Sequence, residues 1–389
     1  MGAADGLLIV HGGGPTAVIN ASLYGAVDEA LNAPQVERVL GALGGVGGIL
    51  EGRFVDFSAV GTAELARLPF SPSSAIGTSR KPLEDEDYAQ LAQALKKHGI
   101  RWLLPTGGNG TMDTCGKIWR ACQAAGVAID VVGIPKTMDN DIAVTDHAPG
   151  FASAARYMAA SVSEVCCDVR GLPIHIAVVE AMGRSAGWVT AASVLADESG
   201  CGGPDLIYLP ERDFDQKSFL DDVQRLIDEK GSGVVVVSEG LHDAAGTPVA
   251  PPLMTVERAT YFGDVSAHLS RLIISELGYK SRSEKPGLLG RASIAWQSDV
   301  DREEAIRCGR AAVAAALEGD SGKTIGIKRV SSDPYAVEYT RIPIEQVMLD
   351  ERRMPDAYIN AAGNGVTDEY RAWLSPLIGG PLRKFTSFV

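Results

Sequence analysis

Residues 131–141 read Val-Val-Gly-Ile-Pro-Lys-Thr-Met-Asp-Asn-Asp and join an apolar run to a polar segment. The apolar residues 131–134 predict the end of a buried strand, and Pro135 stops it because proline has no N–H to donate to a sheet. In a parallel sheet, the residues after such a strand lie in the crevice at the carboxyl edge, where ligands bind. We therefore expect residues 136–141 to carry chemistry.

The polar segment holds a cation, Lys136, a hydroxyl, Thr137, and two carboxylates, Asp139 and Asp141. Carboxylates two residues apart in an extended or turning segment can point at one site. One can accept a proton from an attacking hydroxyl while the other holds a metal or positions a phosphate. The alternative is a capping turn, because Asp and Asn are also favoured in turns and at helix N-termini.

Length and charge narrow the class of protein. A chain of 389 residues predicts two domains. The formal net charge of −13 argues against a nucleic-acid partner, because binding a phosphate backbone needs a basic face. A phosphorylated small molecule is still compatible with this charge, since local cations and metal ions can neutralise it.

The sequence contains no run of 18 apolar residues, and its first residues lack the regions of a signal peptide. We expect a soluble, cytoplasmic protein without a membrane partner. Six cysteines form no Cys-x-x-Cys pair, and the adjacent Cys166 and Cys167 are poorly placed to bridge each other. We expect the cysteines to be buried reduced thiols.

Two segments before residue 131 repeat the order of strand, glycine-rich loop and helix. A helix N-terminus after such a loop presents unpaired N–H groups that suit a phosphate, although the glycines can also serve only a tight turn. In the first segment, Gly14 is the expected N-cap and Pro15 the first helical residue. Strand, loop and helix are expected at 7–10, 12–15 and 16–31, and again at 102–105, 106–111 and 112–125.

Two other stretches of the first half are less informative. Residues 41–53 are dense in glycine and are expected to form a flexible connection. Arg80 and Lys81 place two cations before a helix expected at 84–98. These cations bear on function only if the fold brings them to the same crevice.

In the second half, Arg184, Glu239 and Arg291 each follow an apolar run that is expected to be a strand. Two guanidinium groups and a carboxylate suit a sugar phosphate, and surface ion pairs are the alternative. The alternation of strands and helices predicts an α/β fold with doubly wound, parallel-type sheets. Further strands are expected at 174–180, 206–209 and 234–237, and helices at 185–195, 214–229 and 302–317.

Taken together, the motifs resemble the phosphofructokinase family in order and approximate spacing. The two C-terminal motifs are similar to the branch of that family that contains pyrophosphate-dependent members, and the resemblance covers essentially the whole chain. The motifs are Gly-Gly-Pro-Thr-Ala-Val-Ile-Asn (13–20), Thr-Gly-Gly-Asn-Gly-Thr (106–111), Pro-Lys-Thr-Met-Asp-Asn-Asp (135–141), Met-Gly-Arg (182–184), Ser-Glu-Gly (238–240), Gly-Asn-Gly-Val-Thr-Asp (363–368) and Pro-Leu-Ile-Gly-Gly-Pro-Leu (376–382).

The resemblance implies Mg²⁺-dependent phosphoryl transfer to the 1-hydroxyl of fructose 6-phosphate, giving fructose 1,6-bisphosphate. It implies a catalytic group of Asp139 as base with Lys136 and Thr137, and a metal site at Asn109 and Asp141. The implied donor-binding residues are Gly14, Arg80, Gly108, Asn109, Gly110 and Thr111. The implied residues for the sugar phosphate are Thr137, Asp141, Met182, Gly183, Arg184, Glu239 and Arg291.

The phosphoryl donor is less clearly indicated. In the family, a bulky acidic residue at the position of Gly110 accompanies pyrophosphate use, so Gly110 leaves room for ATP. Lys136 is typical of pyrophosphate users, although some ATP-dependent members carry it too. Asn109 replaces the commoner Asp and removes one metal-coordinating charge. Overall similarity favours pyrophosphate, with ATP as the alternative.

The acceptor also has alternatives. His175 stands where ATP-type bacterial members have an arginine that reaches across a subunit interface, and Ser185 stands where this branch often has His. A neutral His binds phosphate less well than Arg, so another sugar phosphate such as sedoheptulose 7-phosphate is an alternative acceptor. A non-catalytic sugar-phosphate or nucleotide-binding regulator is an alternative from another class, but a pure binder has no need of a base such as Asp139. A dinucleotide-binding dehydrogenase is excluded because the first loop lacks Gly-x-Gly-x-x-Gly.

By resemblance, the fold should consist of two phosphofructokinase-like, Rossmann-like domains with the active site between them. The donor-binding domain is expected at 1–150 plus about 292–346. The sugar-phosphate-binding domain is expected at 151–291 plus about 347–389. The resemblance also implies a homodimer or homotetramer.

Overall fold

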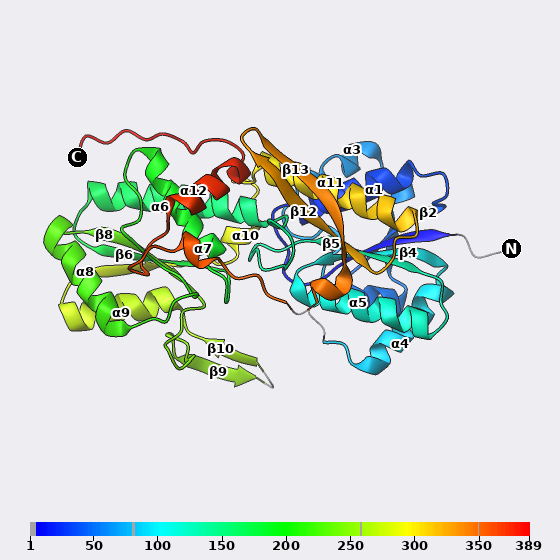
Figure 1. The fold of residues 1–389 in the computed structure, drawn as a ribbon, viewed down its shortest axis with the longest axis horizontal. Helices are drawn as coiled ribbons and strands as arrows, with labels where there is room; N and C mark the ends of the chain where they lie inside the picture. The colour runs from blue at the N-terminus through cyan, green and yellow to red at the C-terminus, as the bar shows by residue number, and fades with distance from the viewer. Residues whose placement is uncertain (1–4, 80–81, 257–258, 349) are drawn as a thin grey trace. The chain divides into compact units, whose positions relative to one another are not determined.

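The computed structural model describes residues 5–79, 82–256, 259–348 and 350–389. These residues form two compact units, and each unit is built from two separate stretches of chain (Figure 1). Unit 1 comprises Met1–Phe151 and Arg291–Arg352, and unit 2 comprises Ala152–Gly290 and Arg353–Val389.

Unit 1 is built on a seven-stranded sheet with the strand order β13-β12-β5-β4-β1-β2-β3. Its inner strands run parallel, whereas β3 and β13 at the two edges pair antiparallel with β2 and β12. The strands are β1 (Gly6–His11), β2 (Arg38–Ala42), β3 (Phe54–Asp56), β4 (Ile100–Gly107), β5 (Asp130–Pro135), β12 (Lys323–Ser332) and β13 (Tyr335–Pro343).

Helices cover both faces of this sheet (Figure 1). Successive residues of β1 alternate between two cores: Leu8 and Val10 join one, and Leu7 and Ile9 join the other. This alternation is expected of a parallel strand that is buried on both sides. The helices of unit 1 are α1 (Ile19–Leu31), α2 (Val46–Glu51), α3 (Thr62–Leu65), α4 (Asp85–Lys97), α5 (Asn109–Ala124) and α11 (Asp299–Leu317).

Helices α1 and α11 approach each other through glycines. A Cβ on Gly25 would lie 2.0 Å from the carbonyl oxygen of Ile306, and one on Gly309 would lie 2.2 Å from that of Ser22. Only a residue without a side chain allows this close packing. The contact anchors the late helix α11 against the first helix of the chain.

Unit 2 contains a four-stranded parallel sheet with the order β11-β6-β8-β7. Apolar side chains of α8 and α9 pack on β6 and β8 in one core, while α7 contacts the same strands and β7. The predicted α/β class with doubly wound, largely parallel sheets is confirmed. Helices α6 (Phe151–Gly171) and α10 (Leu289–Ala292) each contain a point where the chain passes from one unit to the other. The remaining elements of unit 2 are β6 (Ile176–Ala181), β7 (Leu206–Tyr208), β8 (Gly233–Ser238), β9 (Pro252–Val256), β10 (Ala259–Phe262), β11 (Ser281–Glu284), α7 (Trp188–Ala192), α8 (Gln216–Lys230), α9 (Val265–Leu277) and α12 (Asp368–Leu374).

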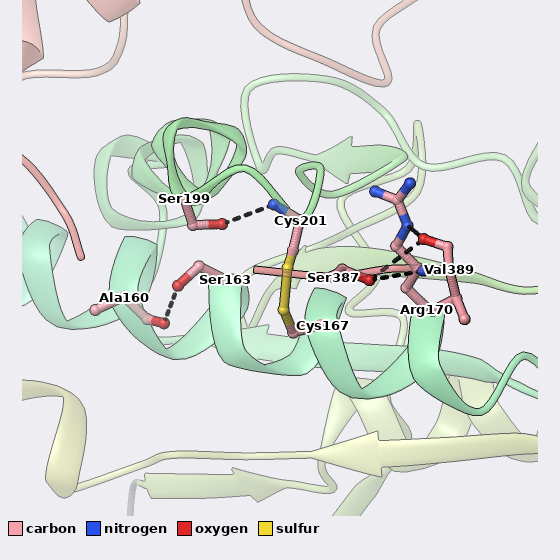
Figure 2. The surroundings of a disulfide bond; sticks show 8 residues. All are labelled: Ala160, Ser163, Cys167, Arg170, Ser199, Cys201, Ser387 and Val389. Atoms are coloured by element: carbon pink, nitrogen blue, oxygen red, sulfur yellow. Dashed lines mark hydrogen bonds between the residues drawn. A yellow bond between two sulfur atoms is a disulfide. The ribbon is translucent and has the colours of Figure 1, made fainter. Parts of the chain in front are cut away.

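Two expectations about loops and cysteines were wrong. The glycine-dense stretch 41–53 is ordered, because it contains helix α2, which ends at Gly52 in the left-handed conformation. Cys167 on α6 forms a disulfide with Cys201, so not all cysteines are reduced thiols (Figure 2). Sequence spacing could not indicate this pair, since 34 positions separate its members. Cys115, Cys122, Cys166 and Cys308 are buried and unpaired.

Among the helices within the described ranges, none is both long and apolar enough to cross a membrane.

Candidate active site

The polar segment after β5 folds back on itself. The backbone N–H of Asp139 donates to Thr137 Oγ1 at 3.1 Å, and Thr137 Oγ1 donates to Asp141 Oδ1 at 3.0 Å. Asn140, between the two carboxylates, has φ of 56°. Asn tolerates this left-handed conformation, which lets the chain reverse within three residues. Thr137, Asp139 and Asp141 are thereby brought together.

Asn109 joins this cluster from the neighbouring strand end. Its side-chain Nδ2 donates to both the carboxylate and the carbonyl oxygen of Asp141, each at 2.9 Å. Helix α5 begins at Asn109, three residues earlier than expected, with Gly108 as its N-cap. The Gly-Asn-Gly sequence is typical of turns, and for this reason the expected start was too late. Asn109, Gly110 and Thr111 therefore form the first turn of the helix.

A divalent metal fits the oxygens of this cluster. Asn109 Oδ1 is a buried acceptor that has no hydrogen-bond partner within the described parts of the chain. Nδ2 of the same amide donates to the Asp141 carboxylate, so the side chains of Asn109 and Asp141 are in direct contact. Across these parts, no group of three or more His, Cys, Asp or Glu side chains could hold a metal alone. Mg²⁺ suits such a site, since it typically takes one or two protein ligands plus waters and substrate phosphates.

The side chain of Lys136 reaches the first glycine loop. Its ammonium group donates to the carbonyl oxygens of Gly12, at 3.2 Å, and Gly14, at 2.5 Å, and the residue is only 3% exposed. A buried ammonium group beside a loop of small residues is a fixed positive charge for a phosphate. The sequence did not predict this contact between Lys136, which follows β5, and the glycine loop that follows β1.

Thr111 packs against the ends of two strands. A Cβ on Gly12 would lie 2.4 Å from Thr111 Oγ1, and one on Gly107 would lie 2.1 Å from it. Glycine at both positions is therefore needed to make room for this threonine. In contrast, a Cβ on Gly110 would meet nothing within 4 Å, and the space next to it is open.

The start of the first helix differs from the expectation. Helix α1 begins at Ile19, and neither Gly14 caps it nor is Pro15 its first residue. Thr16 Oγ1 accepts the N–H of Val18 at 3.4 Å and holds a turn ahead of the helix. Gly14 therefore lies at a bend in the loop before the helix, where Lys136 reaches its carbonyl oxygen.

His11, at the end of β1, was not identified from the sequence. Its Nδ1 lies 2.7 Å from Ser74 Oγ, which donates its own proton to the carbonyl oxygen of Gly77 at 2.8 Å. Nδ1 must then carry the proton, because the serine proton is already used. Burial and the nearby Lys136 ammonium lower the pKa of His11 to about 3, so the ring is neutral.

The His11 contact fixes a loop, residues 71–79, next to the glycine loop. Thr78 Oγ1 donates to the carbonyl oxygen of Gly13 at 2.7 Å. The N–H of Gly13 in turn donates to the carbonyl oxygen of Ser79 at 3.0 Å. The segment leads directly to Arg80, an expected donor-binding residue, which lies outside the described residues.

In unit 2, Glu239 meets the Met-Gly-Arg motif. Glu239 Oε1 accepts the N–H groups of Gly183 and Arg184, each at 3.2 Å. Arg184 adopts a φ of 52°. A Cβ on Gly240 would lie 1.7 Å from the carbonyl oxygen of Arg184. The loop after β6 is therefore shaped by the loop after β8. Gly183 and Arg184 are thereby in contact with Glu239, and Met182 directly precedes them in the chain.

Arg291 and His175, unlike Arg184 and Glu239, do not directly follow the carboxyl end of a strand. Arg291 belongs to the short helix α10 and does not follow a strand, since Leu288 and Leu289 before it are 66% and 63% exposed. The apolar residues before Arg291 suggested a buried strand. The strand in this part of the chain is instead the polar edge strand β11, which ends at Glu284. His175 is buried just before β6, at the opposite end of that strand from Met182.

Comparison with known proteins shows which family this chain belongs to. The family model described as Phosphofructokinase matches residues 6–316, four-fifths of the chain. The chain belongs to the phosphofructokinase family. As a phosphofructokinase, it is a sugar-phosphate phosphotransferase that uses pyrophosphate or ATP.

Several relatives of this phosphofructokinase match over almost their full length. The pyrophosphate–fructose 6-phosphate 1-phosphotransferase of Rhodospirillum rubrum is 39% identical, covering 96% of this chain and 94% of the relative. The sulfofructose kinase of Alkalicoccus urumqiensis is 32% identical, covering 96% and 95%. The crystal structure of a pyrophosphate-dependent phosphofructokinase from Nitrosospira multiformis superposes with a TM-score of 0.90 at 32% identity, covering 99% of this chain and 95% of that one.

Proposed function

We propose that this phosphofructokinase transfers a phosphoryl group from pyrophosphate to the 1-hydroxyl of fructose 6-phosphate, with Mg²⁺, giving fructose 1,6-bisphosphate. The observation that carries the proposal is the buried Lys136 ammonium held at the glycine loop beside the cluster of Thr137, Asn109 and Asp141. The similarity to the pyrophosphate–fructose 6-phosphate 1-phosphotransferase of Rhodospirillum rubrum supports the same donor and acceptor. We also propose a cytoplasmic homo-oligomer.

Asp139 is the general base in this proposal and accepts the proton of the sugar hydroxyl as that oxygen attacks. Thr137 holds the reversal of the chain that presents Asp139, and it donates to Asp141. Asn109 and Asp141 would hold Mg²⁺. When bound, Mg²⁺ neutralises phosphate charge in the transition state.

The donor phosphates are assigned to the first turn of α5 and to the glycine loop. The α5 N-terminus has no side-chain cap, although the N–H of Thr111 already donates to the carbonyl oxygen of Gly108 at 2.8 Å. The N–H groups of Asn109 and Gly110 are assigned to the donor phosphates. Lys136 neutralises charge on the leaving phosphate. The donor-binding set is Gly14, Gly108, Asn109, Gly110 and Thr111, with Arg80 as a further proposed member.

The sugar phosphate is assigned to the loop of Met182, Gly183 and Arg184 together with Glu239 and Arg291. Glu239 already fixes the backbone of Gly183 and Arg184, and it would also accept hydrogen bonds from sugar hydroxyls. Arg184 is exposed and offers a guanidinium fork for the phosphate.

The donor is tested by comparing pyrophosphate with ATP on wild type, Gly110→Asp and Gly110→Ala at fixed Mg²⁺ and fructose 6-phosphate. We expect the wild type to use pyrophosphate and not ATP, and the methyl group of Gly110→Ala to change little in the open space there. Activity of the wild type with ATP that is lost in Gly110→Asp and kept in Gly110→Ala would show that space at Gly110 sets the donor, and the proposal for pyrophosphate would fall.

A second acceptor is favoured by one observation, the 32% identity to a sulfofructose kinase. The same assay with fructose 6-phosphate, sedoheptulose 7-phosphate and 6-sulfofructose separates the candidates by kcat/KM. A higher kcat/KM for either of the other two sugars would replace fructose 6-phosphate as the proposed acceptor. Product formation from none of them would favour a non-catalytic regulator.

A further inference from the structure

The disulfide between Cys167 and Cys201 joins two parts of unit 2 that also hold the last residues of the chain. Cys167 lies near the end of α6, and Cys201 follows the 3₁₀ helix Ser193–Ser199. Their Cα atoms are 5.3 Å apart, a normal separation for a bridge. Figure 2 shows the bond between helix and turn with Ser387 and Val389 beside it.

The segment 384–389 spans the same two parts. At one end, the N–H of Phe385 donates to the carbonyl oxygen of Ser199 at 2.8 Å, and Lys384 donates to that of Glu198. At the other, Arg170 Nε donates to the carbonyl oxygen of Val389 at 2.7 Å. Ser199 is two residues from Cys201, and Arg170 is three residues, about one helical turn, from Cys167. The covalent bond therefore keeps the two anchors of this segment together.

The other end of the bridged region leads to the sugar-phosphate loop. The chain from Gly183 to Cys201 is a continuous series of turns and short helices. The N–H of Ala186 donates to the carbonyl oxygen of Gly183 at 3.0 Å, and that of Ala191 donates to Gly187 at 2.8 Å. A change of mobility at Cys201 can thus reach the backbone around Arg184.

We propose that Cys167 and Cys201 form a reversible redox site that responds to a dithiol–disulfide oxidoreductase and controls how firmly the segment 384–389 and the Arg184 loop are held. The effect on the sugar phosphate rests on the proposed function. In a cytoplasm kept reducing by such dithiols, a protein disulfide is typically a transient or sensing one.

The two cysteines differ in access, which sets the course of the exchange. Cys201 is 3% exposed, whereas Cys167 is half-buried. A thiolate of the reductant attacks Cys167 Sγ, and Cys201 leaves as a thiolate and takes up a proton. The second thiol of the reductant then releases Cys167 as a thiol, so two electrons and two protons pass to the protein and the reductant becomes a disulfide.

The neighbouring Cys166 serves as a matched control. It is buried and unpaired, and burial together with Asp205 and Asp197 raises its pKa to about 12. A thiol that is so rarely ionised reacts slowly in exchange. Cys166→Ala should therefore leave the redox behaviour intact, while Cys167→Ser removes it.

The site is tested by equilibrating the 389-residue chain in dithiothreitol and glutathione buffers that range from fully reducing to fully oxidising. Thiol alkylation and mass spectrometry of tryptic peptides 157–170 and 185–212 then report the state of each cysteine. Cys167 and Cys201 should titrate together in a two-electron step within this range. A bridge that persists under full reduction, or thiols that persist under full oxidation, would overturn the proposal. This readout needs no enzymatic activity, so it stands even if the proposed function fails.

Hydrogen exchange and kinetics test the consequence. On reduction, amides of 384–389 should exchange about tenfold faster, and the KM for fructose 6-phosphate should rise about fivefold at unchanged kcat and unchanged donor KM. Cys167→Ser should show the reduced behaviour in every buffer, and Cys166→Ala should follow the wild type. Reduction of the wild type gives the same comparison without a substitution. Equal exchange and equal KM in both states would refute control by the bond.

Discussion

At the scale of single residues, Asp139 and Asp141 are close in sequence but have different surroundings. The carboxylate of Asp141 accepts hydrogen bonds from Thr137 and Asn109, and the backbone N–H of Asp139 donates to Thr137. We propose Asp139 as the base and Asp141, together with Asn109, as the metal ligand.

The first prediction concerns the base. Asp139→Asn should lower kcat by about 10²- to 10⁴-fold, since general base catalysis contributes about that factor, while the KM values change little. Steady-state kinetics with pyrophosphate and fructose 6-phosphate measure the effect. Asp221→Asn, an exposed carboxylate on α8, is the control and should be fully active. Wild-type kcat in Asp139→Asn would rule out the assigned role.

A second prediction at this scale concerns His11, which donates through Nδ1 to Ser74. His11→Phe removes one buried hydrogen bond next to the glycine loop and should raise the donor KM about two- to tenfold. His11→Asn, whose amide can still donate, should recover most of the loss. Because the pKa of His11 is lowered to about 3, the ratio of mutant to wild-type KM should be constant from about pH 5 to pH 9. A ratio that changes near pH 6.5 would contradict a neutral ring.

At the scale of elements, the helix pair α1 and α11 depends on glycine, and this gives the third prediction. Gly25→Ala places a methyl group 2.0 Å from the carbonyl oxygen of Ile306, and overpacking of this kind should cost about 2–3 kcal/mol of unfolding free energy. Gly47→Ala on α2 meets nothing within 4 Å and should instead stabilise by about 0.5–1 kcal/mol. Denaturant titrations of both variants provide the measurement, and equal effects would contradict the packing.

The loop that follows Asp141 is tied to α11 by a buried cluster. His147 Nε2 lies 2.6 Å from Glu304, its Nδ1 lies 2.8 Å from Asp146, and Tyr335 and Arg329 bind the two carboxylates from the β12–β13 hairpin. Burial disfavours the charged imidazole, but Glu304 and Asp146 outweigh it and raise the pKa of His147 from 6.5 to about 9.

The fourth prediction follows from this raised pKa. The unfolded chain loses the His147 proton near pH 6.5 and the folded one near pH 9, so the cluster stabilises most below pH 6.5 and its contribution is lost as the pH rises through 9. The loss amounts to about 3 kcal/mol. Unfolding free energies from pH 6 to 10 should decline in the wild type and stay flatter in His147→Gln. Parallel curves would show that His147 does not hold its proton.

The sequence predicted the elements whose cause is local, and it missed those that depend on distant partners. The strand that ends at Pro135 and the cluster of Thr137 and Asp141 follow from an apolar run, a proline that ends the strand, and closely spaced polar groups. The contact from Lys136 to Gly12 and the bond from Cys167 to Cys201 join residues far apart in the chain, and no local pattern encodes them. Arg291 was misplaced because hydropathy cannot distinguish exposed leucines from buried ones.

At the scale of the whole molecule, the disulfide lies entirely within unit 2, and this gives the fifth prediction. Reduction should lower the unfolding free energy of unit 2 by about 3–4 kcal/mol, as expected for a loop of 34 residues, and leave unit 1 unchanged. Global-exchange amides of β6 and β8 report on unit 2, and those of β1 and β4 report on unit 1. A uniform loss across both sets would show that the units unfold as one.

The order of strands in unit 1 has a consequence for synthesis on the ribosome. Strand β5 ends at Pro135, but its sheet neighbour β12 begins at Lys323, roughly 190 residues later, after most of unit 2 has been made. At about 5–20 residues per second, translation leaves the outer edge of β5 unpaired for about 10–40 s. A nascent chain with an open strand edge is prone to pair with another such chain. Slower initiation, which spaces ribosomes further apart on the message, should therefore raise the soluble yield of this protein more than a lower temperature that slows elongation as well.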